Sequence, residues 1–340
     1  MSISKYLVTG GAGFIGSNFI HFLLKRYDDI TIINFDNLTY AGNLNNLSTI
    51  EKDPRYTFVK GDIRECKKVK KVFDQFGPDY VINFAAESHV DRSILHPDIF
   101  VRSNILGVQN LLQVSLQHGV TRFLQISTDE VYGSLGKTGK FYETTPLDPR
   151  SPYSASKASA DLLTQAYLST FNLPVNITRS SNNYGLYQFP EKLIPLTILN
   201  CLNGKKIPVY GDGLNVRDWI HVLDHARALD MLLQKGVVGE VYNIGVDNER
   251  SNIEITKMIL KILGKPESLM EYVADRPGHD RRYAIDASKI AKLGWTPIYT
   301  KEKFEQGLNE TVQWYKDNTA WVEKIRAKMS EINQQIQFKK

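Results

Sequence analysis

Cysteine is scarce in this chain, and long apolar runs are missing from it. Cys66 and Cys201 are the only cysteines among 340 residues, and they show neither CxxC nor metal-ligand spacing. This argues against a disulfide framework, and we expect two reduced thiols. No segment approaches the roughly 18 apolar residues that cross a bilayer. The N-terminal residues lead into a strand-like stretch at Tyr6–Val8 instead of a signal-peptide core, so we expect a cytoplasmic protein with no membrane partner.

A concentrated basic surface is missing as well. Lysine and arginine are interspersed with acidic residues, and the net charge is +5. This excludes the basic stripe of a nucleic-acid-binding protein and favours a local pocket for an anion. His221 and His225 have helical spacing, but no third ligand accompanies them, so we expect no metal site.

Strands and helices alternate through the first half of the chain. Apolar runs typical of buried strands occur near residues 5–9, 30–35, 56–60, 80–84, 122–127 and 174–179. This alternation predicts an α/β fold of the Rossmann type, with a doubly wound parallel sheet. The segment Asp98–His118 has apolar residues on more than one face, which predicts a long helix with one face available to a partner subunit.

The regular alternation ends near residue 180. Beyond it, prolines interrupt short elements, which predicts a smaller mixed α/β domain over the edge of the sheet. We therefore divide the chain into a Rossmann domain (1–180), a smaller substrate domain (181–330) and a tail (331–340). Some strands or helices of the second part can return to the first.

A glycine-rich turn follows the first strand. The sequence Thr9-Gly10-Gly11-Ala12-Gly13-Phe14-Ile15-Gly16 leads from a strand into a helix, a context that makes the pattern specific for dinucleotides. The glycines let the backbone approach a pyrophosphate, and the helix N-terminus faces its charge. Asp36 ends the second strand, where a carboxylate binds both ribose hydroxyls and repels a 2′-phosphate, so NAD is favoured over NADP. Later strand ends add Asp62-Ile63 and Phe84-Ala85-Ala86-Glu87-Ser88.

Two groups of polar residues are candidates for catalysis. Tyr153 and Lys157 lie on one face of a predicted helix, and an ammonium beside a phenol stabilises the phenolate, which can then act as a base. Asp129 and Glu130 follow the fifth strand. Like charges so close raise the pKa of one of them and give an acid next to a base. On the residues alone, a polar turn after the strand explains this second pair equally well.

Several motifs together resemble the extended short-chain dehydrogenase/reductase family. They are TGGAGFIG at residues 9–16, YSASK at 153–157 and NNYG at 182–185. Within that family the chain is similar to the dTDP-glucose 4,6-dehydratases over nearly its whole length. The distinguishing motif is Thr128-Asp129-Glu130, because epimerases of the family typically have small hydroxyl residues there. Further matches are Asp36–Tyr40, Ala85–Asp91 and Asp275–Tyr283.

The resemblance implies conversion of dTDP-glucose to dTDP-4-keto-6-deoxyglucose and water. Tyr153, assisted by Lys157, would take the proton from the hydroxyl on carbon 4 while NAD accepts the hydride. Glu130 would remove the carbon 5 proton, and protonated Asp129 would donate to the departing carbon 6 hydroxyl before the hydride returns to carbon 6. Thr128 would orient the carbon 4 oxygen. The expected pathway is deoxysugar synthesis of the dTDP-rhamnose type.

The resemblance also implies a set of binding residues and no metal. NAD belongs mainly to the first domain and the nucleotide sugar mainly to the second. The residues implied for the cofactor are Gly10, Gly13, Phe14, Ile15, Gly16, Asp36, Asn37, Leu38, Thr39, Asp62, Ile63, Ala85, Ala86, Ser88, Tyr153, Lys157 and Asn183. Those implied for the substrate are Ser88, Thr128, Asn182, Lys192, Leu193, Pro208, Tyr210, Arg217, Asn252, Arg276 and His279.

In the family, helices like that at 98–118 and that of Tyr153 pair with their copies, which implies a homodimer held by a four-helix bundle. Two other functions stay open. A nucleotide-sugar 4-epimerase shares the fold, NAD and the Tyr–Lys pair, although epimerisation has no leaving hydroxyl for Asp129 to protonate. An NAD-binding regulator without catalysis is the alternative from another class. The preference for thymidine over uridine is also open at this point.

Overall fold

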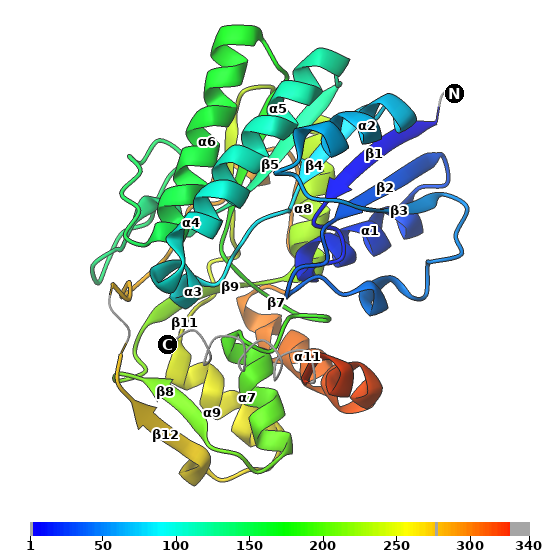
Figure 1. The fold of residues 1–340 in the computed structure, drawn as a ribbon. Coiled ribbons are helices and arrows are strands. Elements are labelled where there is room, and N and C mark those ends of the chain that lie inside the picture. Colours follow the sequence, from blue (N-terminus) through cyan, green and yellow to red (C-terminus); the bar gives the residue numbers. More distant parts are fainter. Residues whose placement is uncertain (1–2, 276–277, 327–340) are drawn as a thin grey trace.

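A parallel sheet forms the centre of the fold. The structure is a computed structural model that describes residues 3–275 and 278–326. Within these residues the main sheet has seven strands in the order β10-β6-β5-β4-β1-β2-β3 (Figure 1). Its strands are β1 (Ser4–Thr9), β2 (Ile30–Asp36), β3 (Tyr56–Lys60), β4 (Tyr80–Asn83), β5 (Arg122–Thr128), β6 (Val175–Ser180) and β10 (Val241–Ile244). The order runs outward from β1 in both directions, so the predicted doubly wound Rossmann fold is confirmed.

Helices cover both faces of this sheet. On one face lie α1 (Phe14–Arg26), α8 (Val222–Lys235) and the short α10 (Ser288–Ala291); on the other lie α2 (Cys66–Phe76), α5 (Gly107–His118) and α6 (Pro152–Phe171). Each side has its own apolar core. Phe19 of α1 and Leu229 of α8 are buried in the first, and Val69 of α2 and Leu111 of α5 in the second. Two covered faces explain why the strands read as nearly continuous apolar runs.

The long helix predicted at 98–118 is helical throughout but not regular. After α3 (Val90–Leu95), it consists of α4 (Pro97–Phe100), a π-helical segment η2 (Val101–Leu106) and then α5. Asn104 lies buried in the π-helical segment. Its side chain accepts from the Glu87 N–H and donates to the Glu87 carbonyl and the Ser156 hydroxyl. The wider turn thus joins the loop after β4 to the helix α6, and π-helical turns of this kind are frequent at functional sites.

The rest of the chain forms a smaller mixed layer below the ends of the main strands (Figure 1). It contains a three-stranded sheet in the order β11-β9-β7 and a two-stranded sheet of β12 and β8. These strands are β7 (Asn182–Tyr184), β8 (Ile207–Tyr210), β9 (Val216–His221), β11 (Glu249–Ser251) and β12 (Met270–Val273). The helices are α7 (Leu193–Leu202), α9 (Asn252–Ile262), α11 (Phe304–Asp317) and residues 319–326, with 3-10 turns η4 (Glu267–Leu269) and η5 (Lys301–Lys303). Two further 3-10 turns, η1 (Leu44–Leu47) and η3 (Asp129–Tyr132), follow β2 and β5 of the main sheet.

Three elements from beyond residue 180 lie with the main sheet. Strand β10 pairs with β6, α8 packs against α1, and α10 lies on the same face of the sheet as α8. The short β10 was not among the strand predictions. The division at residue 180 stays a prediction, and the predicted tail at 331–340 lies outside the described residues. No helix in the described part of the chain is long and apolar enough to span a membrane.

Candidate active site

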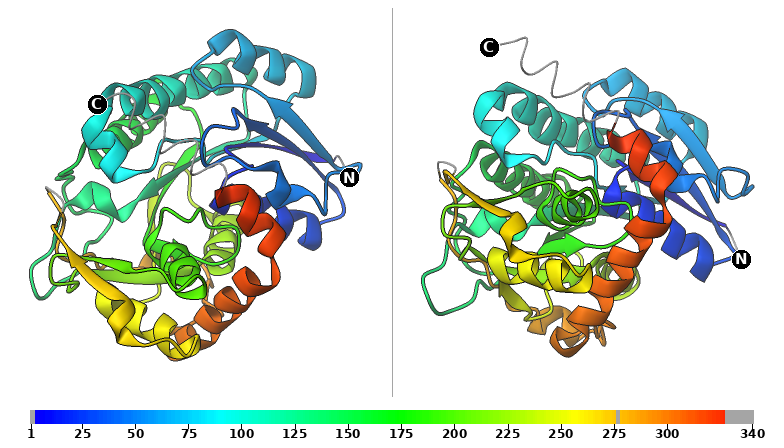
Figure 2. Two further views of the ribbon diagram at one scale, coloured as in Figure 1. Left: turned by 60° about the horizontal axis from the view of Figure 1, so that its bottom comes forward. Right: turned by 90° about the horizontal axis from the view of Figure 1, so that it is seen from below.

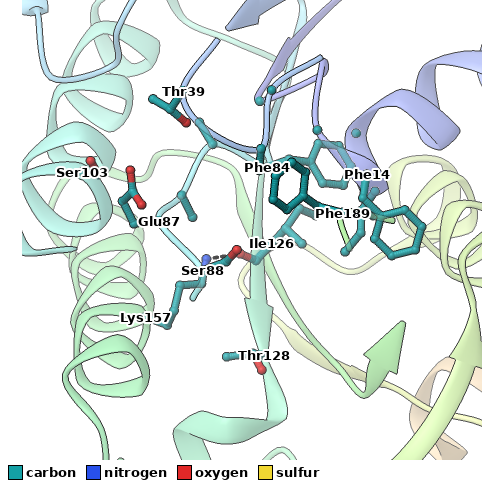
Figure 3. Close-up of a pocket in the computed structure, with 18 of the residues that line it drawn as sticks. Phe14, Thr39, Phe84, Glu87, Ser88, Ser103, Ile126, Thr128, Lys157 and Phe189 are labelled. Carbon is teal, nitrogen blue, oxygen red and sulfur yellow. Dashed lines mark hydrogen bonds between the residues drawn. The ribbon is translucent and has the colours of Figure 1, made fainter. Parts of the chain in front are cut away.

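A cavity of about 330 Å³ opens where the parallel strands end (Figure 3). Most of the residues predicted from the sequence line it. For the cofactor these are Gly10, Gly13, Phe14, Ile15, Gly16, Asp36, Asn37, Thr39, Asp62, Ile63, Ala85, Ala86, Ser88 and Asn183, and for catalysis and substrate Thr128, Asp129, Glu130, Tyr153, Lys157, Asn182 and Lys192. Parallel strands deliver their carboxyl ends to one edge, which is why motifs far apart in the sequence meet here.

The glycine-rich turn has the geometry of a pyrophosphate cradle. Gly10 has a φ of +69°, and a Cβ there would lie 2.6 Å from the Ala85 nitrogen. A Cβ on Gly16 would lie 2.5 Å from the Gly10 carbonyl oxygen. Gly13 caps α1 without a side-chain hydrogen bond to the first turn, so the helix N-terminus faces the cavity with its N–H groups. These residues fit a dinucleotide phosphate.

Two carboxylates line the cavity where the sequence predicts the adenosine of the cofactor. Asp36 is buried, and its carboxylate accepts from the Ala12 N–H at 3.0 Å and from the Leu38 N–H at 2.7 Å. Carboxylate oxygens accept hydrogen bonds from hydroxyl groups such as those of a ribose. Asp62 is held by Arg64 and accepts from the Asn37 amide at 2.8 Å. Leu38 itself has a φ of +56° and does not line the cavity, so its predicted role reduces to this backbone contact.

Helix α6 places Tyr153 and Lys157 in the cavity. A capping box of Ser151 and Ser154 starts the helix just before them. Both catalytic candidates are buried, and the Lys157 ammonium donates to the Ile126 carbonyl of β5 at 2.5 Å (Figure 3). Burial lowers the pKa of Lys157 to about 8. This ammonium is therefore fixed between the helix and the strand that carries the acidic turn.

The pKa of Tyr153 moves against the prediction from the Tyr–Lys spacing. Burial raises it well above its usual range, and the nearby carboxylates of Glu130 and Asp129 raise it further, while a hydrogen bond with Thr128 lowers it. The charge of Lys157 does not offset these effects. In the protein alone, the phenol keeps its proton at neutral pH.

The acidic pair lies on the 3-10 turn η3, directly after β5. Thr128 caps this turn, and its hydroxyl accepts from the Glu130 N–H at 3.3 Å. Asp129 is buried, and its pKa is raised well above the usual range by burial, by the charge of Glu130 and by that of Asp218. A carboxyl group whose raised pKa favours the protonated form thus lies beside a second carboxyl group in the same cavity. That is the arrangement an elimination needs.

A buried ion pair connects helix α6 to the end of the acidic turn. Asp161 follows Lys157 by one helical turn on α6, and Arg179 of β6 donates to its carboxylate at 2.9 Å. The same guanidinium donates to the Tyr132 hydroxyl at 3.0 Å, at the end of the acidic turn. The Tyr132 hydroxyl in turn donates to Asn243 of β10. Sequence reasoning did not detect this network.

The remaining predicted substrate residues do not line the cavity. Leu193 begins α7, Pro208 and Tyr210 lie on β8, and Asn252 begins α9. Arg217 is buried on β9, where it donates to the Val216 and Asp280 carbonyls and stacks on the Tyr283 ring. His279 pairs with Asp275 at 2.6 Å. Arg276 lies outside the described residues. Arg217 lies close enough to Asp129 for its charge to lower the pKa of that carboxyl group, whereas the other described residues of this set do not reach the cavity. The substrate role of all of them stays a prediction.

Several cavity residues were missed. Ser180 ends β6 and Ser181 follows it, and the strand-end rule that found Asp36 would have found them too. Glu191, Gln188 and Phe189 lie on the loop before α7 and carry no comparable sequence signal.

The two histidines with helical spacing have structural partners. His221 accepts from the Leu223 N–H and so caps α8. His225 is buried and bonds with the Asn183 side chain at 2.8 Å, and burial lowers the pKa of His225 to about 3. Among the described residues, no group of three or more His, Cys, Asp or Glu side chains could hold a metal ion.

Comparison with known proteins yields close relatives. A family model described as GDP-mannose 4,6 dehydratase matches residues 7–311. The chain is 52% identical to a dTDP-glucose 4,6-dehydratase of Xanthomonas campestris pv. campestris, covering 95% of this chain and 96% of that one. A dTDP-glucose 4,6-dehydratase of Bacillus anthracis, solved with NAD, is 54% identical with a TM-score of 0.88 and covers 95% and 99% of the two chains. A Streptomyces venezuelae dTDP-glucose 4,6-dehydratase, solved with NAD and dTDP, is 48% identical with a TM-score of 0.90 and covers 93% and 98%.

Proposed function

The chain belongs to the dTDP-glucose 4,6-dehydratase group of the extended short-chain dehydrogenase/reductases, and on this premise we propose that it converts dTDP-glucose to dTDP-4-keto-6-deoxyglucose and water. The enzyme is thus an NAD-dependent hydro-lyase. The observation that carries this function is the buried Asp129 beside Glu130, in one cavity with the glycine-rich turn and Tyr153, where burial raises the pKa of Asp129.

The overall reaction oxidises carbon 4, removes water across carbons 5 and 6, and reduces carbon 6. The cofactor fits the turn of Gly10, Gly13 and Gly16 at its pyrophosphate and Asp36 at its ribose. Bound NAD supplies a reversible hydride acceptor and a positive nicotinamide charge, which favours ionisation of a nearby phenol.

Tyr153 is the base that takes the proton from the carbon 4 hydroxyl. Its raised pKa in the protein alone makes it a poor base before substrate and cofactor bind. Lys157 then contributes its positive charge from a fixed position, because its ammonium is bonded to the Ile126 carbonyl. Thr128 lies within the same cavity and orients the carbon 4 oxygen.

The ketone at carbon 4 makes the carbon 5 proton acidic. Glu130 removes that proton, and Asp129 gives its own proton to the carbon 6 hydroxyl, which leaves as water. The C–O bond at carbon 6 breaks as the double bond between carbons 5 and 6 forms. Burial of Asp129 has a direct purpose in this step, because an ionised carboxylate could not protonate the leaving group.

The test is to mix the purified protein with dTDP-glucose and no added cofactor. We expect the mass of the sugar to fall by one water, together with the alkaline absorbance of a 4-keto-6-deoxy sugar. An unchanged mass with dTDP-galactose accumulating would establish the 4-epimerase instead. Retained NAD with no turnover of dTDP-glucose or UDP-glucose would favour the regulator.

Three further properties belong to this proposal. Exposed apolar residues on the helices near 98–118 and on α6, including Val101, Leu106 and Leu162, suit a homodimer held by a four-helix bundle. A cytoplasmic location follows from the expected supply of nucleotide sugar. Deoxysugar synthesis of the dTDP-rhamnose type is the pathway we propose for the product.

A further inference from the structure

We propose that Trp321, which does not line the cavity, is a positioning residue that holds the glycine-rich loop in place and slows the release of NAD. This rests on the proposed function for its cofactor alone. The described C-terminal residues 319–326 lie against the first part of the Rossmann fold, as both views of Figure 2 show. None of the proposed catalytic steps uses the contact between this segment and the Rossmann fold.

The contact is one hydrogen bond between buried groups. The Trp321 indole N–H donates to the Asn46 side-chain oxygen at 2.8 Å, and both residues are at most 8% exposed. The chain spans 275 residues between these two positions. Asn46 lies on η1, in the segment that follows the cavity-lining residues Thr39 and Gly42.

Asn46 is also hydrogen-bonded to the glycine-rich turn. Its amide donates to the Ala12 carbonyl at 3.0 Å, and the Asn43 N–H donates to the same carbonyl at 2.9 Å. The Ala12 N–H in turn donates to the Asp36 carboxylate. A line of hydrogen bonds therefore runs from the C-terminal segment, through one asparagine, to the peptide between the phosphate-binding glycines and to the ribose-binding carboxylate.

A second contact holds the same segment to another residue of the cavity lining. The buried Tyr315 hydroxyl of α11 donates to the carbonyl of Gln188, which lines the cavity. The neighbouring Tyr187 has a φ of +66° and packs its ring against Trp314 and Trp321. The segment 304–326 thus contacts two loops near the predicted cofactor site, and movement of either loop away from it breaks one of these contacts.

The proposed reaction requires NAD to stay bound until it is complete. Hydride that leaves carbon 4 must return to carbon 6 of the same sugar, so a cofactor lost in mid-reaction leaves an unfinished intermediate. A fastened loop slows cofactor release without touching the reacting atoms. Phenylalanine at position 321 removes the N–H donor but keeps an aromatic ring in the cluster.

The experiment loads the holoprotein with radiolabelled NAD and follows loss of label during a chase with unlabelled NAD. We expect Trp321→Phe, which removes one hydrogen bond, to release NAD about fivefold faster. Asn46→Ala removes two, to Trp321 and to the Ala12 carbonyl, and should release NAD at least as fast as Trp321→Phe. The double variant should be no faster than the quicker single variant, because both break one line of contacts. Trp314→Phe, in the same aromatic cluster, is the matched control and should release NAD at the wild-type rate.

Release at the wild-type rate in both Trp321→Phe and Asn46→Ala would overturn the proposal. So would equal acceleration by Trp314→Phe, since that would show a general effect of the aromatic cluster. Thermal unfolding of each holoprotein identifies a variant that has lost its fold, and the other single variant then decides. The chase needs no turnover, so its result is independent of whether dTDP-glucose is the substrate.

Discussion

The ammonium of Lys157 donates a 2.5 Å hydrogen bond to the carbonyl of Ile126, two residues before Thr128. The helix that carries the proposed base is thereby tied to the strand that carries the proposed acid. Movement of either element disturbs both halves of the reaction.

The first prediction concerns alkaline pH. Burial lowers the pKa of Lys157 to about 8, so its charge is present below that pH and is lost above it. We expect the turnover rate to fall by about tenfold for each pH unit above that value, since the charge that supports the Tyr153 phenolate disappears. Lys157→Arg should be slower, but its rate should stay level across the same alkaline range. An identical alkaline decline in both proteins would assign it to another group.

The second prediction separates oxidation from elimination. The double variant Asp129→Asn with Glu130→Gln lacks the acid and the base for water loss, whereas Tyr153 and Lys157 are intact. Bound substrate should still reduce the cofactor, visible as the absorbance of NADH, while the keto sugar falls by at least about a hundredfold. Keto sugar formed at a near-normal rate would contradict the proposed roles of both carboxyl groups.

The third prediction concerns stability. The pKa of Asp129 is raised in the folded state above its usual 3.8, so the folded protein keeps a proton that the unfolded chain loses. Stability therefore decreases as pH rises from about 3.8, until the folded pKa is passed. Asp129→Asn removes this dependence, and we expect it to be more stable by roughly 1–2 kcal/mol at neutral pH. Thermal unfolding of both proteins at several pH values tests this, and an Asp129→Asn variant that is no more stable than the wild type at neutral pH would refute it.

The sequence predicts the part of the site that depends on strand ends. Gly10, Asp36, Asp62 and Glu130 each follow an apolar run, and the parallel topology brings them to one edge. Contacts between residues far apart in the sequence have no such local pattern. Nothing local pairs Trp321 with Asn46, and the direction of the Tyr153 pKa depends on burial that appears only in the folded chain.

The short strand β10 shows that the fold, too, depends on contacts that the local sequence does not predict. Its four residues, Val241–Ile244, join the sheet beside β6, while the chain between them builds much of the smaller layer. An apolar run so short does not distinguish an edge strand from a loop. Likewise the π-helical turn at Asn104 depends on Glu87 and Ser156, which come from other segments.

The last prediction concerns the buried pair of Asp161 and Arg179. Asp161→Asn leaves the guanidinium buried without its counter-charge, so we expect a loss of about 3–5 kcal/mol in the free energy of unfolding. Replacing both residues together, by Leu and Met, should cost less than the single change, because no unpaired charge remains.

The same carboxylate raises the pKa of Lys157 against the effect of burial. Asp161→Asn should therefore shift the alkaline decline in turnover to lower pH, whereas a merely structural role would lower the rate equally at every pH. Chemical denaturation gives the first quantity and the pH–rate profile the second. An unmoved profile with lowered stability would mean that Asp161 supports the fold and leaves the charge of Lys157 unchanged.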